Sequence, residues 1–139
     1  MRARLVALLL PALLPGCITT AAPCPGGMQA QVRAELVFGR SLKTGGTVSD
    51  AAWRRFAAEE ITPRFPEGFT VLDGRGQWRG PQARGARGRI VREPSKVLLV
   101  AMPDDPERRA RLAAIAEAYK RAFGQDSVLT LATPSCVSF

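Results

Sequence analysis

Residues 97–102 read Val-Leu-Leu-Val-Ala-Met, an unbroken apolar run. Runs of this length without a polar side chain are typical of a central strand that is buried on both faces of a sheet. The sequence on either side of this run shows which elements accompany the strand, and their order determines the fold class.

A helix and a final strand follow the run. Asp105 is a suitable N-cap, with Pro106 and Glu107 in the first turn, and Gly124 is a suitable C-terminal stop. Residues 128–132 (VLTLA) then predict the last strand. One face of the helix carries apolar residues at helical spacing, namely Leu112, Ile115, Ala116, Tyr119 and Phe123.

Two strands and a helix precede the run. Residues 31–38 alternate between apolar and polar side chains, which predicts a half-buried strand. Ser49 and Asp50 are typical of a helix start, and Pro63 ends that helix. Residues 69–73 (FTVLD) predict a second strand, which Gly74 to Gly76 interrupt.

The predicted order of elements is β-α-β-β-α-β, an α+β arrangement of the ferredoxin-like kind. Residues 74–92 are expected to form an extra Arg/Gly-rich hairpin between the second and third main strands. Right-handed crossovers place both helices on one face of the sheet. The other face must then be covered by the Trp78 hairpin or by a second copy of the chain, and we predict a face-to-face homodimer.

Composition excludes several classes of site. The chain has 139 residues, of which 46% are hydrophobic and 23% charged, as expected of one globular domain, here residues 31–139. It has no histidine, which excludes Ser-His-Asp and Cys-His nucleophiles and every metal site that needs imidazole. Three cysteines are too few for a zinc ribbon. We therefore expect neither a metal nor a cofactor.

The N-terminal residues are typical of a bacterial export signal. A basic start with Arg2 and Arg4 precedes an apolar run over 5–14, which is too short to span a bilayer. Leu14 to Cys17 (LPGC) resembles a lipobox, whose cysteine receives a diacylglycerol before cleavage on its N-terminal side. Cleavage after Ala22 by the ordinary signal peptidase is the alternative.

The lipobox interpretation divides the chain into three parts. Residues 1–16 are the signal peptide, residues 17–30 are the lipid anchor on Cys17 and a short tether, and the domain follows. The protein is then held by lipid in the cell envelope and faces the periplasm. Without the two leader arginines, 18 basic and 12 acidic residues remain, a charge of +6 that favours anionic partners. Nucleic acid is not expected as a partner in that compartment.

Two cysteines remain once Cys17 carries the lipid. Cys24 and Cys136 lie near the two ends of the mature chain, in an oxidising compartment where disulfides persist. The first and last strands of the predicted sheet are antiparallel neighbours, which brings the residues before 31 close to those after 132. We therefore predict a disulfide between Cys24 and Cys136.

The segment from Gly74 to Glu93 carries arginines without an acidic residue between Asp73 and Glu93. Arginines on a glycine-rich hairpin bind phosphates or carboxylates through paired hydrogen bonds. A solvated loop whose arginines reflect genome composition is the alternative. The candidate anion-binding residues, suited to lipid phosphates or other envelope anions, are Arg75, Trp78, Arg79, Arg89, Arg92 and Lys96.

Two functional interpretations remain. The main prediction is a non-enzymatic, membrane-tethered binding module of the envelope. The alternative is a small cofactor-free enzyme that uses a carboxylate/arginine cluster near the 73–96 hairpin, with Asp73 or Glu93 as the base. A concave site that holds either carboxylate with a strongly shifted pKa favours the enzyme, and a flat arginine-rich hairpin favours binding. No individual residue is assigned a catalytic role.

Several stretches together resemble the bacterial family catalogued as domain of unknown function 3574. The resemblance covers residues 24–139 and implies an exported, compact protein, in many members with a lipoprotein leader; it implies no activity. The stretches that carry it are residues 34–40 (AELVFGR), 62–66 (TPRFP), 68–78 (GFTVLDGRGQW), 92–97 (REPSKV), Tyr119-Lys120, 123–125 (FGQ) and 136–139 (CVSF).

Overall fold

The computed structural model describes residues 23–79, 88 and 90–139. The predicted signal peptide, the lipidation site Cys17 and the candidate residue Arg89 lie outside the described residues. In the part of the chain that is described, no helix is long and apolar enough to cross a membrane.

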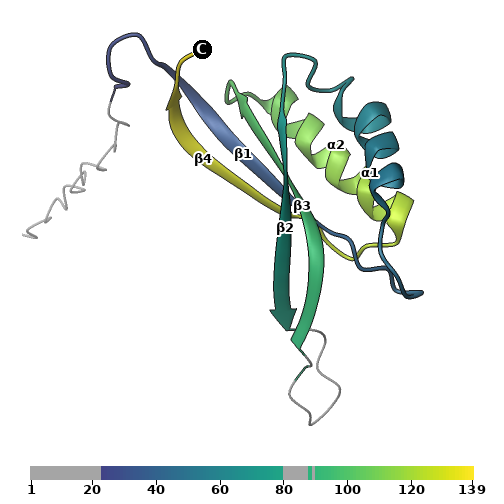
Figure 1. Cartoon of the computed structure of the whole chain (residues 1–139). Coiled ribbons are helices and arrows are strands. Elements are labelled where there is room, and N and C mark those ends of the chain that lie inside the picture. Colours follow the sequence, from purple (N-terminus) through teal and green to yellow (C-terminus); the bar gives the residue numbers. More distant parts are fainter. Residues whose placement is uncertain (1–22, 80–87, 89) are drawn as a thin grey trace, which may run out of the picture.

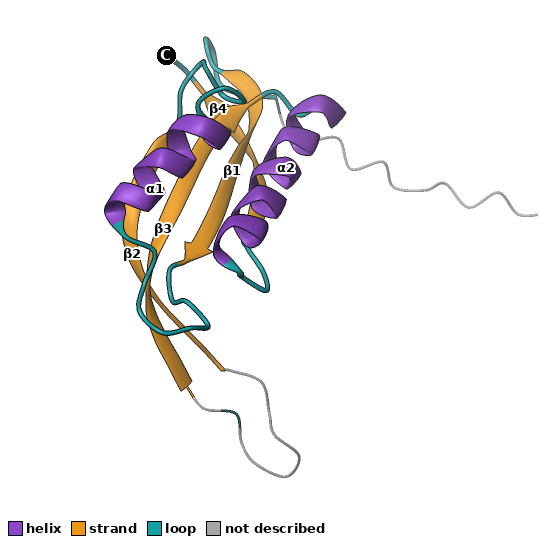
Figure 2. Cartoon of the chain, turned by 90° about the vertical axis from the view of Figure 1, so that its right-hand side faces the viewer, coloured by secondary structure: helices purple, strands orange, loops and turns teal. Residues whose placement is uncertain are grey.

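The fold is α+β, as predicted, with a four-stranded antiparallel sheet in the order β2-β3-β1-β4. Both helices lie on one face of this sheet (Figures 1 and 2). The strands are β1 (Gln29–Gly39), β2 (Thr70–Arg79), β3 (Ile90–Met102) and β4 (Leu129–Val137). The helices are α1 (Asp50–Phe56), which continues as the π-helical turn η1 (Ala57–Ile61), and α2 (Pro106–Phe123).

The predicted helix boundaries are confirmed. Ser49 Oγ accepts a hydrogen bond from the backbone N–H of Ala52, and an Asp105 carboxylate oxygen caps α2 in the same way. Gly124 ends α2 with a left-handed backbone, φ 64°. The first helix ends directly before Pro63, although its last turn is wider than an α-helical turn: the N–H of Thr62 bonds to the carbonyl of Ala57, five residues back.

The strands are longer than predicted, and the reason is clearest at Gly74. A Cβ built on this residue would lie 2.8 Å from Ser95 Oγ, so the glycine allows close contact with β3 and does not break the strand. β2 and β3 therefore pair without interruption from Thr70–Leu99 to Arg79–Ile90, and most of the residues predicted to connect the extra hairpin, 80–87 and 89, lie outside the described residues. β4 passes through Pro134, which an edge strand tolerates.

The core lies between the sheet and the helices. Every second residue of β1 is buried on that side, and an aromatic cluster fills the space against α1 and α2. Ring centroids within this cluster are 4.7 Å apart for Phe38 and Tyr119 and 5.2 Å apart for Phe56 and Tyr119. The cluster consists of Phe38, Trp53, Phe56, Tyr119 and Phe123.

The prediction that residues 97–102 of β3 are buried on both faces of the sheet is wrong for the single chain. Leu98, Val100 and Met102 are buried against the helices, whereas Val97 and Leu99 on the opposite face are only half-buried. The helices cover one face of the sheet, and the β2–β3 hairpin extends beyond the end of the sheet instead of folding over the other face (Figures 1 and 2). The second face is therefore open.

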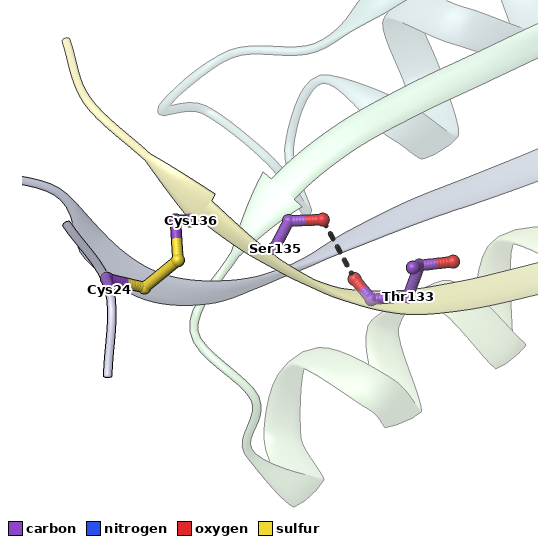
Figure 3. Close-up of a disulfide and its surroundings, with 4 residues drawn as sticks. All are labelled: Cys24, Thr133, Ser135 and Cys136. Carbon is purple, nitrogen blue, oxygen red and sulfur yellow. Dashed lines mark hydrogen bonds between the residues drawn. A yellow bond between two sulfur atoms is a disulfide. The ribbon is translucent and has the colours of Figure 1, made fainter. Parts of the chain in front are cut away.

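The two ends of the described chain meet at the edge of the sheet. Ala30 on β1 pairs with Cys136 on β4, and the segment before β1 returns Cys24 to the same place (Figure 3). The Cα atoms of Cys24 and Cys136 are 5.6 Å apart and their sulfur atoms 2.10 Å apart, the distance of a disulfide. This geometry supports the predicted bridge, whose chemical test is described in the Discussion.

Candidate functional site

The candidate site lies where the β2–β3 hairpin meets the end of β1, and its central group is the Glu93 carboxylate. One carboxylate oxygen accepts a hydrogen bond from the indole N–H of Trp78 at 2.9 Å. The other accepts one from the backbone N–H of Ser41 at 3.2 Å. A Cβ on Gly39 would lie 2.7 Å from this carboxylate, so a larger residue there would displace the Glu93 side chain from its present position.

Gly39 is itself held from the core side. The buried Tyr119 hydroxyl donates a hydrogen bond to the Gly39 carbonyl at 2.9 Å. Burial raises the pKa of Tyr119 well above its usual range, so the phenol stays protonated and keeps this donor. The aromatic core thus positions the backbone against which Glu93 rests.

A cleft of about 500 Å³ opens beside Glu93. Strand alternation places the Arg75 and Arg92 side chains on one face of this strand pair and the Glu93 carboxylate on the other, so the arginines and the carboxylate do not share one wall of the cleft. The lining residues are Arg75, Gly76, Gln77, Arg92, Glu93 and Pro94. The arginines are therefore suited to an anionic group of a small molecule.

A separate charged cluster lies on the helix side of the same strands. Lys96 Nζ lies 2.5 Å from Asp73 Oδ1 and 3.3 Å from Asp50 Oδ1, and Arg40 lies 3.0 Å from Asp50. The Asp73 hydrogen bond raises the pKa of Lys96, and hydrogen bonding to Lys96 holds the pKa of Asp50 below its usual value. Because these groups neutralise one another, this cluster stabilises the base of the hairpin. Each of its two cations, Arg40 and Lys96, already has an acidic partner.

The predicted anion-binding residues are thus divided. Arg75 and Arg92 line the cleft, and Trp78 contacts Glu93. Arg79 lies farther out on the hairpin, where its guanidinium approaches the Gly88 carbonyl at 3.4 Å. Lys96 belongs to the other cluster, on the opposite side of β3 from Glu93.

Sequence reasoning missed Gly39 and Ser41. Both are more than 50 residues from Glu93 in the chain, so no local spacing connects them, although the quoted stretch 34–40 contains Gly39 and ends directly before Ser41. Among the described residues, no three His, Cys, Asp or Glu side chains come together as a metal site.

Two solved structures share the fold at low sequence identity. One is a phage SAM lyase in complex with S-methyl-5'-thioadenosine, with a TM-score of 0.58 and 15% identity over 87% of this chain and 97% of the other. The second is a phage SAM lyase in the apo state, with a TM-score of 0.54 and 14% identity over 86% and 97% of the two chains. A search of curated protein sequences found no match.

This likeness corrects our main functional prediction. A non-enzymatic binding module was expected, whereas the solved structures of similar fold are of an enzyme, and the alternative prediction of a small enzyme agrees better with them. At this level of identity the likeness itself shows the fold alone. The sequence gives a more direct assignment: a family model matches residues 33–139, and the chain belongs to the family described as protein of unknown function (DUF3574).

Proposed function

We propose that this chain is a small cofactor-free enzyme and that Glu93 is its general base. The observation that carries the proposal is the placement of the Glu93 carboxylate, which two hydrogen-bond donors orient beside the exposed Trp78 ring. A fixed carboxylate at hydrogen-bond distance from a substrate is the requirement for general-base catalysis.

The remaining residues suit substrate binding. The guanidinium groups of Arg75 and Arg92 bind a carboxylate or phosphate through paired hydrogen bonds. The Trp78 ring is 46% exposed and offers a flat surface to a cationic group or a planar ring. The site therefore favours a substrate with a cationic or planar group near Trp78 and Glu93, whose anionic group extends past the strand edge to the arginines on the neighbouring face.

An elimination is a reaction that one carboxylate base can catalyse without a cofactor. Glu93 takes a proton from a C–H group of the substrate, the electrons of that bond form a new double bond, and the cationic leaving group departs with the electrons of its own bond. The likeness in fold to a SAM lyase supports this class, and SAM has the required cation, carboxylate and planar base.

The test is turnover of SAM by the purified chain, measured as release of S-methyl-5'-thioadenosine by chromatography. Glu93→Gln keeps the size of the side chain and removes the base, and we expect a loss of about 100-fold or more in kcat. Glu59→Gln, an exposed carboxylate on η1, is the matched control and should leave kcat unchanged. Wild-type chain without turnover would contradict SAM as substrate, and full activity of Glu93→Gln would contradict the site.

We also infer the finer features that the sequence predicts. The strand order β2-β3-β1-β4 supports the ferredoxin-like arrangement. The lipobox supports a lipid anchor on Cys17 and a location in the cell envelope, and the +6 charge of the chain after the leader supports an anionic envelope component as a further partner.

A further inference from the structure

The open face of the sheet carries an apolar row that crosses all four strands. The register joins Leu72 to Val97, Val97 to Val37, and Val37 to Leu129. Leu72 is 51% exposed and Leu129 is 55% exposed. In the next row Leu99 and Leu131 lie on either side of Glu35. We name these six apolar residues the open-face strip: Val37, Leu72, Val97, Leu99, Leu129 and Leu131.

Nothing in the described part of the chain covers this strip. Both helices pack on the opposite face, and the β2–β3 hairpin continues past the end of the sheet (Figures 1 and 2). Half-exposed leucines in a continuous row are typical of a surface that another molecule covers. The strip explains why β3 is apolar at six successive positions although the helices cover only alternate ones.

The area of this face is close to the requirement of a specific interface. Four strands about 4.8 Å apart are about 19 Å wide, and the nine residues of β4 extend about 30 Å, so the face measures about 570 Å² in projection. Two such faces bury about 1,100 Å² before the additional surface area of the projecting side chains is counted. Specific interfaces begin at about 1,200 Å² in total.

The charges on the face favour a second copy over other occupants. Arg33 and Glu35 lie beside the strip on β1 and form an ion pair with each other. A two-fold arrangement lets Arg33 of one copy reach Glu35 of the partner subunit and the reverse, so a face with both signs is complementary to itself. A membrane surface or a uniformly charged partner would place a charge of like sign against either Arg33 or Glu35.

We propose that two copies of this chain pack face to face through the open-face strip. The two sheets then form a sandwich, with the leucines of one copy in contact with those of the other and the helices outermost. This inference rests on the sheet and is independent of the role of Glu93.

The test is the mass in solution of the chain isolated from cells that express the full sequence, measured by light scattering over a range of concentrations. The double variant Leu72→Lys/Leu131→Lys places a charge at each side of the strip, and the ammonium group introduced at position 131 can pair with Glu35 in the monomer. Ala113→Lys adds the same charge on the exposed side of α2 and is the control.

We expect twice the monomer mass for the wild-type chain and the control at high micromolar concentration, and at least a 100-fold higher dissociation constant for the double variant. Circular dichroism of the aromatic core reports whether the variant is folded, and the single variant Leu129→Lys replaces it if it is not. A monomeric wild-type chain, a mass of three or more chains, or an unchanged dimer of the folded variant would overturn the proposal.

Discussion

Removal of the Cys24–Cys136 link should lower the free energy of unfolding substantially. The two residues are 112 positions apart, so the bond closes a loop that includes nearly all of the described chain. For a loop of about 100 residues, the restricted entropy of the unfolded chain corresponds to about 4.7 kcal/mol. Compact unfolded states reduce this value, and we expect a loss of about 2–4 kcal/mol.

Urea denaturation of the oxidised and the reduced chain measures this loss. With a slope of about 1–3 kcal/mol per molar urea, the midpoint should fall by about 1–3 M on reduction, and the slope should rise because the reduced chain unfolds further. The double variant Cys24→Ala/Cys136→Ala should reproduce the reduced chain and no longer respond to reductant. Two alkylatable thiols at these positions in freshly isolated protein, located by peptide mapping, would refute the reasoning.

Three further predictions concern single residues. Tyr119→Phe keeps the ring but removes the buried hydroxyl that donates to the half-buried Gly39 carbonyl, so stability should fall by about 1 kcal/mol in thermal or urea unfolding; an unchanged midpoint would show that water replaces the hydroxyl. Lys96→Met should destabilise the chain at neutral pH. Its hydrogen bond with Asp73 raises the pKa of Lys96, so the stabilising contribution is complete below the ordinary value of 10.5 and is lost as pH rises through the folded value; the difference in midpoint between wild type and variant should therefore shrink in alkali, and a constant difference would contradict the ion pair. Cys17→Ser should leave an unprocessed precursor on immunoblots of membrane fractions, whereas normal maturation of this variant would show that cleavage occurs at the alternative site.

The sequence predicted those features of the fold that depend on neighbouring residues. The caps at Ser49, Asp105 and Gly124 are local signals, because each satisfies backbone groups within one turn of its own position. The alternation in β1 predicted which side chains are buried. Strand lengths were less well predicted. From the sequence alone Gly74 is expected to interrupt the second strand, and only its contact with Ser95 shows that the strand continues through it.

The sequence by itself determined the α+β class and the order of the elements, because apolar periodicity and chain order carry that information. Only the tertiary structure decided that Glu93 contacts Trp78 and Ser41 while Asp73 pairs with Lys96, since adjacent strand positions point to opposite faces and the register assigns each carboxylate to one of them. It also supplied Gly39 and Ser41, which reach Glu93 across more than 50 residues of chain. Contacts at such separations depend on how strands pair, and no pattern within a single segment specifies that pairing.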